Sequence, residues 1–116
     1  MSEPQLLGGF EQLVLLAVVR LDDAAYGVSI QREIAECTGR KVTPGALYTT
    51  LDRLERKGLV SPRVGDPTPE RGGRAKRYYV VTKAGRQKLA EEQAYVRALS
   101  EGLNLLGGRN VQSNVC

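Results

Sequence analysis

One segment of this sequence, residues 43–58, carries a helix start signal, an apolar stripe and a helix stop signal in that order. Thr43 can cap a helix, and Pro44 suits the first helical position, where no amide hydrogen is needed. Gly58 suits the left-handed position that follows a helix. Three leucines at spacings of four and three share one face: Leu47, Leu51 and Leu54. The segment predicts a helix over Pro44–Lys57, about 21 Å long, which can enter a major groove of DNA.

Two more helices are predicted upstream. The run from Phe10 to Leu21, FEQLVLLAVVRL, is too short to cross a bilayer and too apolar to have a solvent face. It predicts a buried central helix, and periodicity leaves a buried strand as the alternative. Residues 26–39 place apolar side chains on one helical face and end at Gly39, a stop signal. That face makes Cys37 a small core residue rather than a reactive thiol.

A β-hairpin is predicted after the third helix. Residues 59–64 and 76–82 have strand character, and Pro62 marks the first as an edge strand. The segment between them holds two prolines, three glycines and two arginines, which is typical of a hairpin tip. Tyr78 and Tyr79 alternate faces, so one belongs to the core, and the sequence leaves open which one.

The last helix is predicted over residues 83–106, with a length of about 36 Å. Its apolar residues follow a heptad-like seam that is interrupted at Glu92. The helix could pack on its own domain, but about 80 preceding residues are too few to cover it, so we expect self-association. The residues assigned to dimerisation are Phe10, Leu13, Leu89, Val96, Leu99, Leu103 and Leu106. The chain thus divides into a domain over 1–82, a dimerisation helix over 83–106 and a frayed tail over 107–116.

The net charge of +4 is unevenly distributed along the chain. Residues 1–39 carry two basic and six acidic side chains, and residues 89–116 carry two basic and three acidic ones. Residues 40–88 carry thirteen basic and four acidic side chains, so almost all of the positive charge lies there. This asymmetry indicates a polyanionic partner such as nucleic acid, or else a solvated basic surface without a partner.

Composition excludes several kinds of chemistry. Without histidine there is no Ser-His-Asp triad, no Cys-His pair and no imidazole ligand. Two cysteines 79 positions apart cannot form a CxxC metal or redox site. No apolar run is long enough to span a membrane, and the N-terminus lacks the basic start of a secretory signal. We therefore expect a cytoplasmic binding protein that is not an enzyme and holds neither a metal nor a cofactor.

The order of elements is typical of a helix-turn-helix followed by a wing, in a mainly α-helical fold with a small β-hairpin. The stretches AYGVSIQREI, TPGALYTTLDRLERKGLV and GRAKRYYVVTKAGRQKL also resemble the PadR family of bacterial transcriptional regulators. The resemblance covers about residues 7–106 and is closest to the short branch with a single C-terminal helix. It implies a dimeric winged-helix protein that binds a pseudo-palindromic operator, commonly as a repressor. Some members release DNA on binding a small molecule. For this chain the existence of an effector stays open.

Ten residues are candidates for DNA contact. The resemblance assigns Tyr48 to the family's reading-helix tyrosine, with a half-buried packing residue as the alternative. Exposure on the predicted helix adds Thr49, Arg53 and Gly45, and an arginine there can hold guanine, unless this is only a solvated surface. Lys41 and Thr43 lie at the helix start, where free amides bind phosphate. The wing candidates are Arg71, Arg74, Lys76 and Arg77.

Two alternatives remain open from sequence. A winged helix can also serve as a protein–protein interaction module without DNA binding. An aromatic effector pocket between subunits is weakened here because the chain has no tryptophan and a single phenylalanine, Phe10.

Overall fold

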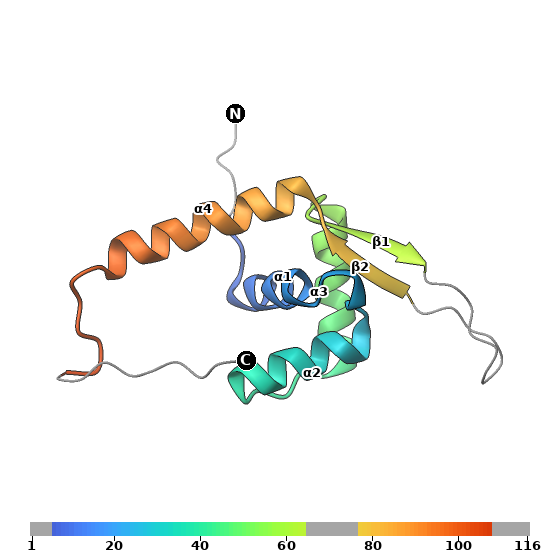
Figure 1. The fold of residues 1–116 in the computed structure, drawn as a ribbon, viewed down its shortest axis with the longest axis horizontal. Coiled ribbons are helices and arrows are strands. Elements are labelled where there is room, and N and C mark those ends of the chain that lie inside the picture. The colour runs from blue at the N-terminus through green and yellow to red at the C-terminus, as the bar shows by residue number, and fades with distance from the viewer. Residues whose placement is uncertain (1–5, 65–76, 108–116) are drawn as a thin grey trace.

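The computed structural model describes residues 6–64 and 77–107 and shows a mostly helical winged-helix fold (Figure 1). Its elements in chain order are α1 (Gly9–Leu21), the short 3-10 helix η1 (Asp22–Ala24), α2 (Gly27–Thr38), α3 (Pro44–Arg56), β1 (Val60–Val64), β2 (Arg77–Val81) and α4 (Lys83–Ser100). The predicted fold class is confirmed. Of the predicted wing and tail, residues 65–76 and 108–116 lie outside the described residues.

Helix α1 lies at the centre of the fold, between α4 on one side and α2 on the other (Figure 1). Its residues Val14, Leu15 and Val18 are almost completely buried. A second apolar face of α1, formed by Leu13, Leu16 and Val19, is only half-buried. The expectation that α1 has no solvent face is therefore wrong, because within the described chain only part of its circumference is packed against α2, α3, β2 and α4.

Helix α3 has the predicted stripe and the predicted ends. The three leucines of the stripe are completely buried. The Thr43 hydroxyl accepts a hydrogen bond from the Ala46 amide at 3.2 Å, which caps the helix. Gly58 follows with a φ of 77°, a conformation that glycine adopts at little cost. Local capping chemistry therefore sets both ends of α3, and the helix is one residue shorter than predicted.

The two strands form an antiparallel hairpin in which Val60 pairs with Val81 and Val64 pairs with Arg77. The Tyr79 amide also donates to the Ala25 carbonyl at 2.8 Å, which attaches the hairpin to the segment before α2. Tyr79 is the buried tyrosine, with 4% exposure. The ring of Tyr78 is half-buried, and its centroid lies 5.4 Å from that of Tyr26 in an edge-to-face arrangement. The core and surface roles of the tyrosine pair are thereby assigned.

Helix α4 begins as predicted but ends earlier. The Thr82 hydroxyl accepts from the Gly85 amide at 3.0 Å and donates to the Gly58 carbonyl at 2.7 Å. The helix ends at Ser100, not at residue 106, because Glu101 adopts an extended conformation with a ψ of 132° and Gly102 follows with a positive φ of 79°. Leu103 and Leu106 are exposed and lie beyond the helix end, so the predicted seam does not continue along one helix.

Leu89 also differs from its prediction as a dimerisation residue. It is 6% exposed and belongs to the chain's own core. Beyond it, α4 extends past the rest of the helical body (Figure 1), and Val96 and Leu99 are 57% and 81% exposed. The apolar surface of α4 that is open to another molecule therefore begins only after its first half.

Candidate nucleic-acid interface

Helix α3 exposes one continuous face on the side opposite its buried leucines. Helical spacing places Gly45, Thr49 and Arg56 near the middle of this face, while Tyr48 and Arg53 lie on its two flanks. All five residues are exposed. The structure thus brings four of the predicted contact residues together on one surface and adds Arg56, which is not among the predicted contacts.

The start of α3 supplies the remaining described candidates upstream of the wing. Lys41 and Thr43 are both exposed, and Thr43 is the N-cap residue. The first turn of a helix has amides without intrahelical acceptors, and these amides attract anions. A phosphate group at this position would meet the amides, the Thr43 hydroxyl and the positive charge of Lys41. This end of α3 is therefore suited to hold a DNA backbone.

The tyrosine on the flank of α3 is placed by a glycine on α2. A β-carbon added to Gly27 would lie 1.9 Å from the Tyr48 hydroxyl oxygen and 2.7 Å from the carbon that bears it. The Tyr48 ring therefore lies directly against the start of α2 and still keeps 48% exposure. Sequence reasoning missed Gly27, although the glycine stands in the quoted AYGVSIQREI stretch. The Tyr48 side chain is thus packed on one side, as the packing alternative expects, and open on the other, and its contact with DNA stays a prediction.

Two carboxylates, Asp52 and Glu11, form three ion pairs with basic residues in or next to α3. Asp52 and Arg56 form an ion pair at 2.5 Å on the exposed face, as the i,i+4 spacing favours. Arg53 lies 3.9 Å from the carboxylate of Glu11, a buried residue of α1. The same carboxylate receives the Lys57 ammonium at 2.9 Å and 3.1 Å. Arg53 is thus exposed as predicted, but it lies on the α1 side of the helix.

The Glu11 carboxylate is held in its charged form. Burial raises its pKa, but the Gly8 amide, Lys57 and Arg53 outweigh burial and bring the pKa below its ordinary value of 4.5. The Tyr79 hydroxyl shows the opposite direction, since burial raises its pKa above 10.0. Glu11 therefore stays negative beside the cations of α3 at neutral pH.

The base of the wing carries two arginines that already have protein partners. Arg77 donates to the Glu55 carboxylate at 3.1 Å and lies over the Tyr79 ring. Arg63, which was not predicted, donates to the Asp23 carbonyl at 2.7 Å and lies 4.9 Å from the centre of the Tyr78 ring. Arg77 would therefore have to give up its pair with Glu55 to reach DNA, and its predicted contact stays a prediction. Arg71, Arg74 and Lys76 lie outside the described residues.

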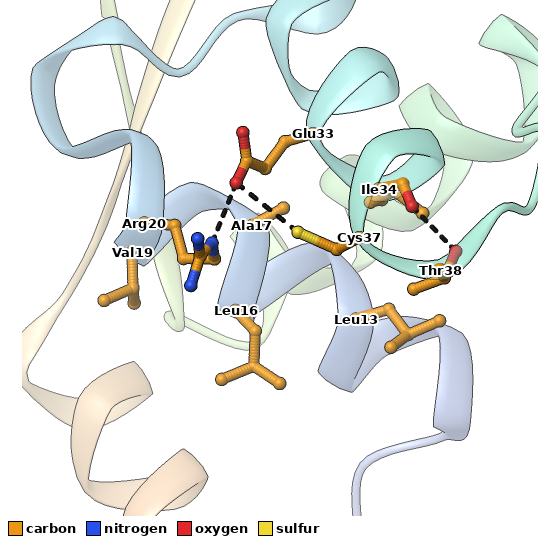
Figure 2. A pocket seen from close by; sticks show the side chains of 9 residues that line it. All are labelled: Leu13, Leu16, Ala17, Val19, Arg20, Glu33, Ile34, Cys37 and Thr38. Atoms are coloured by element: carbon orange, nitrogen blue, oxygen red, sulfur yellow. Dashed lines mark hydrogen bonds and ion pairs between the residues drawn. The ribbon is translucent and has the colours of Figure 1, made fainter. Parts of the chain in front are cut away.

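A second candidate surface is the groove between α1 and α2, away from the exposed face of α3. It encloses about 300 Å³ and is lined mainly by aliphatic side chains. Figure 2 shows Leu13 and Leu16 on its α1 side, with Arg20 and Cys37 both directed at Glu33. The Arg20–Glu33 ion pair measures 2.8 Å. Cys37 is half-buried at the groove, so its predicted core position is wrong, because this end of α2 is only partly covered.

Together, the exposed reading helix, its capped basic start and the hairpin define a winged-helix DNA-binding regulator. The Transcriptional regulator PadR-like family matches residues 15–91, and the chain belongs to this family. It is 40% identical over 92 residues, 77% of each chain, to the transcriptional regulator Rv3488 of Mycobacterium tuberculosis.

Solved structures agree with this assignment. A PadR-like transcription factor from Bacteroides fragilis has a TM-score of 0.69 and 26% identity, over 84% of this chain and 89% of its own. A complex structure of hsRosR-S1 has a TM-score of 0.65 and 26% identity, over 84% and 77% of the two chains. The PadR-like family and the Bacteroides fragilis protein are transcription regulators, a class distinct from enzymes. Within the described residues, no helix is both long and apolar enough to cross a membrane.

Proposed function

We propose that this protein is a homodimeric, sequence-specific repressor that acts in the cytoplasm and binds a pseudo-palindromic operator. The observation that carries the proposal is the exposed face of α3, which combines a small residue, hydroxyl groups and an arginine on a helix of suitable length. A helix of this kind reads base edges in a major groove. Two copies would place their α3 helices in half-sites about one helical turn apart, roughly 34–36 Å.

Each candidate residue has a proposed contact. Thr49 and Gly45 approach base edges, since they lie in the first half of the exposed face. Lys41, Thr43 and Tyr48 bind backbone phosphates, because amides, hydroxyls and ammonium groups fix the register of a protein on DNA. Arg53 contacts DNA at the edge of the interface when it leaves Glu11. The wing contributes backbone or minor-groove contacts through Arg71, Arg74, Lys76 and Arg77.

Self-association is supported by two apolar surfaces that the chain leaves uncovered, one on the second half of α4 and one on α1. Val96 and Leu99 project from the second half of α4, and Leu103 and Leu106 follow them. The half-buried face of α1, with Phe10 and Leu13, offers a complementary apolar surface. Exposed apolar surface of this extent is characteristic of protein interfaces. If the second half of α4 from one copy packs against the half-buried face of α1 in the other copy, both apolar surfaces are covered.

Release by a small-molecule effector would use the α1–α2 groove, whose volume of about 300 Å³ is at the lower end of ligand sites. Its lining is aliphatic, with the Arg20–Glu33 pair at one end. The chemistry favours an apolar ligand over one that needs aromatic stacking. A ligand in this groove would compete with the partner subunit, which gives a physical route from binding to release.

Selection of binding sequences from random oligonucleotides tests the central proposal. We expect a palindromic consensus, and binding to it should lose affinity with a log–log salt slope of about −5 to −9, which corresponds to six to ten phosphate contacts. Titration with random duplex DNA at physiological salt distinguishes the alternative of a protein–protein module, which would give no binding. A salt-independent affinity would contradict the proposal.

Two variants assign the residues. Thr49→Ala should relax the consensus at one or two positions, because base contacts carry sequence information. Gly27→Ala should displace the Tyr48 ring and weaken all sequences by a similar factor. Gly9→Ala provides a matched glycine control, since Gly9 lies at the start of α1, outside the proposed DNA contacts, and nothing lies within 4 Å of a β-carbon there. If Gly27→Ala has no more effect than Gly9→Ala, the assignment of Tyr48 is wrong.

A further inference from the structure

Glu11 is a buried carboxylate in the first turn of α1. The residue is 5% exposed, yet its two oxygens face the C-terminal end of α3. Lys57 reaches both oxygens, at 3.1 Å and 2.9 Å, and the Arg53 guanidinium lies 3.9 Å from one of them. One negative charge therefore engages two of the cations that α3 carries.

We propose that Glu11 is a positioning residue that withholds Lys57, and in part Arg53, from DNA. The inference rests on the proposed function and deepens it, because it concerns the strength and salt dependence of the same interface. The Lys57 side chain is 32% exposed, compared with 77% for Arg56 on the open face. An ammonium that makes two short contacts to a buried carboxylate has to give up both to reach a phosphate. The operator affinity is therefore lower than the charge of α3 alone would give.

The position of Glu11 is fixed from the other side by backbone amides. The Gly8 amide donates to Glu11 at 2.9 Å, and the adjacent Leu7 amide donates to both oxygens of Glu92 on α4, at 3.0 Å and 2.9 Å. Two consecutive amides thus connect α4 to the carboxylate that holds α3. The low pKa of Glu11 keeps this carboxylate charged at neutral pH.

Salt titration of operator binding with Glu11→Gln tests the proposal. Glutamine keeps an oxygen for the Gly8 amide but removes the charge, so Lys57 and Arg53 become free to meet phosphates. We expect tighter binding and a log–log slope that is steeper by about 1 to 2, since each added phosphate contact contributes roughly 0.9. Each such contact multiplies the affinity loss between 50 and 200 mM salt by about 3.5. Glu91→Gln is the matched control, because it makes the same charge change at an exposed position on α4.

A second pair of variants does not depend on replacing the buried carboxylate. Lys57→Gln should leave the wild-type slope unchanged, because Lys57 does not contact DNA while Glu11 holds it. Arg56 is also paired, with Asp52, but both of these side chains are open to solvent, so the pair is weak and yields readily to a phosphate. Arg56→Gln removes the same charge from the exposed face and should make the slope shallower by about 0.9. Thermal melting followed by circular dichroism checks that each variant is folded.

The possible failures are distinguishable. If Lys57→Gln lowers the slope as much as Arg56→Gln, or if folded Glu11→Gln binds like wild type and Glu91→Gln, Glu11 does not withhold these cations and the inference is overturned. In that case wild type still binds its operator and the proposed function stands. If wild type shows no salt-dependent binding, the proposed function itself fails, and the inference fails with it.

Discussion

Helix α3 and the second half of α4 carry similar apolar spacings but have opposite surroundings. The apolar stripe of α3 is completely buried inside the chain, and its polar face is open. In the second half of α4, the apolar residues themselves are open, with Leu99 at 81% exposure. Periodicity indicates which side chains share a face, but not whether the surface that covers this face comes from the same chain.

The boundary between these two situations lies within α4. Leu89 and Glu92 are buried. Tyr95 and Val96 follow Glu92 by about one helical turn, and both are exposed. The first half of α4 is thus part of the domain, and the second half is available to a partner. Substitutions in the buried leucine stripe of α3 should therefore lower the stability of the fold. Substitutions in the exposed second half of α4 should instead weaken the association of two copies.

The largest effect on stability is expected from the substitution Leu51→Ala. This side chain is completely buried in the core that α3 shares with α1 and α2. Loss of a buried leucine leaves a cavity and should lower the free energy of unfolding by about 3–4 kcal/mol. Chemical denaturation measures the change. A loss below about 1 kcal/mol would show that the stripe is less tightly packed than the structure indicates.

Leu99→Ser should leave folding intact but weaken self-association. Burial of a leucine contributes about 1.5–3 kcal/mol, and twofold symmetry counts it twice, so partial burial predicts a loss of about 2–3 kcal/mol per dimer. Analytical ultracentrifugation should therefore show a dimer dissociation constant that is higher by roughly 30- to 150-fold. Ala98→Ser, an exposed neighbour on another side of the helix, is the control. Equal behaviour of the two variants would place the interface elsewhere.

Glu92→Gln tests the boundary between the two halves of α4. The carboxylate accepts from the Leu7 amide and from the Gln12 side chain at 3.0 Å, and Lys88 lies 3.6 Å away. A glutamine oxygen at the Oε1 position can still accept from both donors, but the NH₂ group at the Oε2 position would face the Leu7 amide and the Lys88 ammonium, at a cost of about 1–2 kcal/mol. Hydrogen exchange at the Leu7 amide should accelerate along with the loss of stability. If exchange at Leu7 is unchanged, this amide is not held by α4.

The smallest effect is expected for Glu11→Gln, in the pH dependence of the melting temperature under acidic conditions. Because the pKa of Glu11 is lower in the folded protein than its ordinary value of 4.5, the charged carboxylate stabilises the fold above that pH. This contribution should disappear as the pH falls from about 4.5 through the folded-state pKa. Melting temperatures between pH 6 and pH 3 should therefore fall more steeply for wild type than for Glu11→Gln. Parallel curves would show that Glu11 is not selectively stabilised in its charged form.

The parts of the structure that the sequence predicted depend on local chemistry. Thr43, Pro44 and Gly58 determine the ends of α3 within the helix itself, so their pattern was sufficient. The end of α4 was misplaced because the heptad spacing was followed through Gly102, whose backbone conformation does not continue a helix. Here the local signal was present but received less weight than the periodicity.

The candidate site was predicted less completely because several of its contacts join distant residues. Glu11 meets Lys57 across 46 positions, and Leu7 meets Glu92 across 85. Glu11 is not distinguishable from a surface residue in the sequence, and Glu92 stands out only because it interrupts the apolar seam, which does not reveal its partners. Gly27 had a signal in the AYG stretch, but its contact with Tyr48 depends on how α2 and α3 pack. Residue types alone do not determine such packing.

The close contact at Gly85 holds the first turn of α4 against the hairpin, so the direction of the whole helix depends on this contact. A β-carbon at this position would lie 2.3 Å from the Leu59 carbonyl oxygen, so only a glycine allows the helix to come this close to the residue before β1. From Gly85 to Leu99 the helix axis runs about 21 Å. A tilt of 10° at this contact would therefore move the far end by about 4 Å, close to the width of a methyl group. The absence of a side chain at Gly85 thus helps to determine the position of Leu99 relative to the rest of the fold.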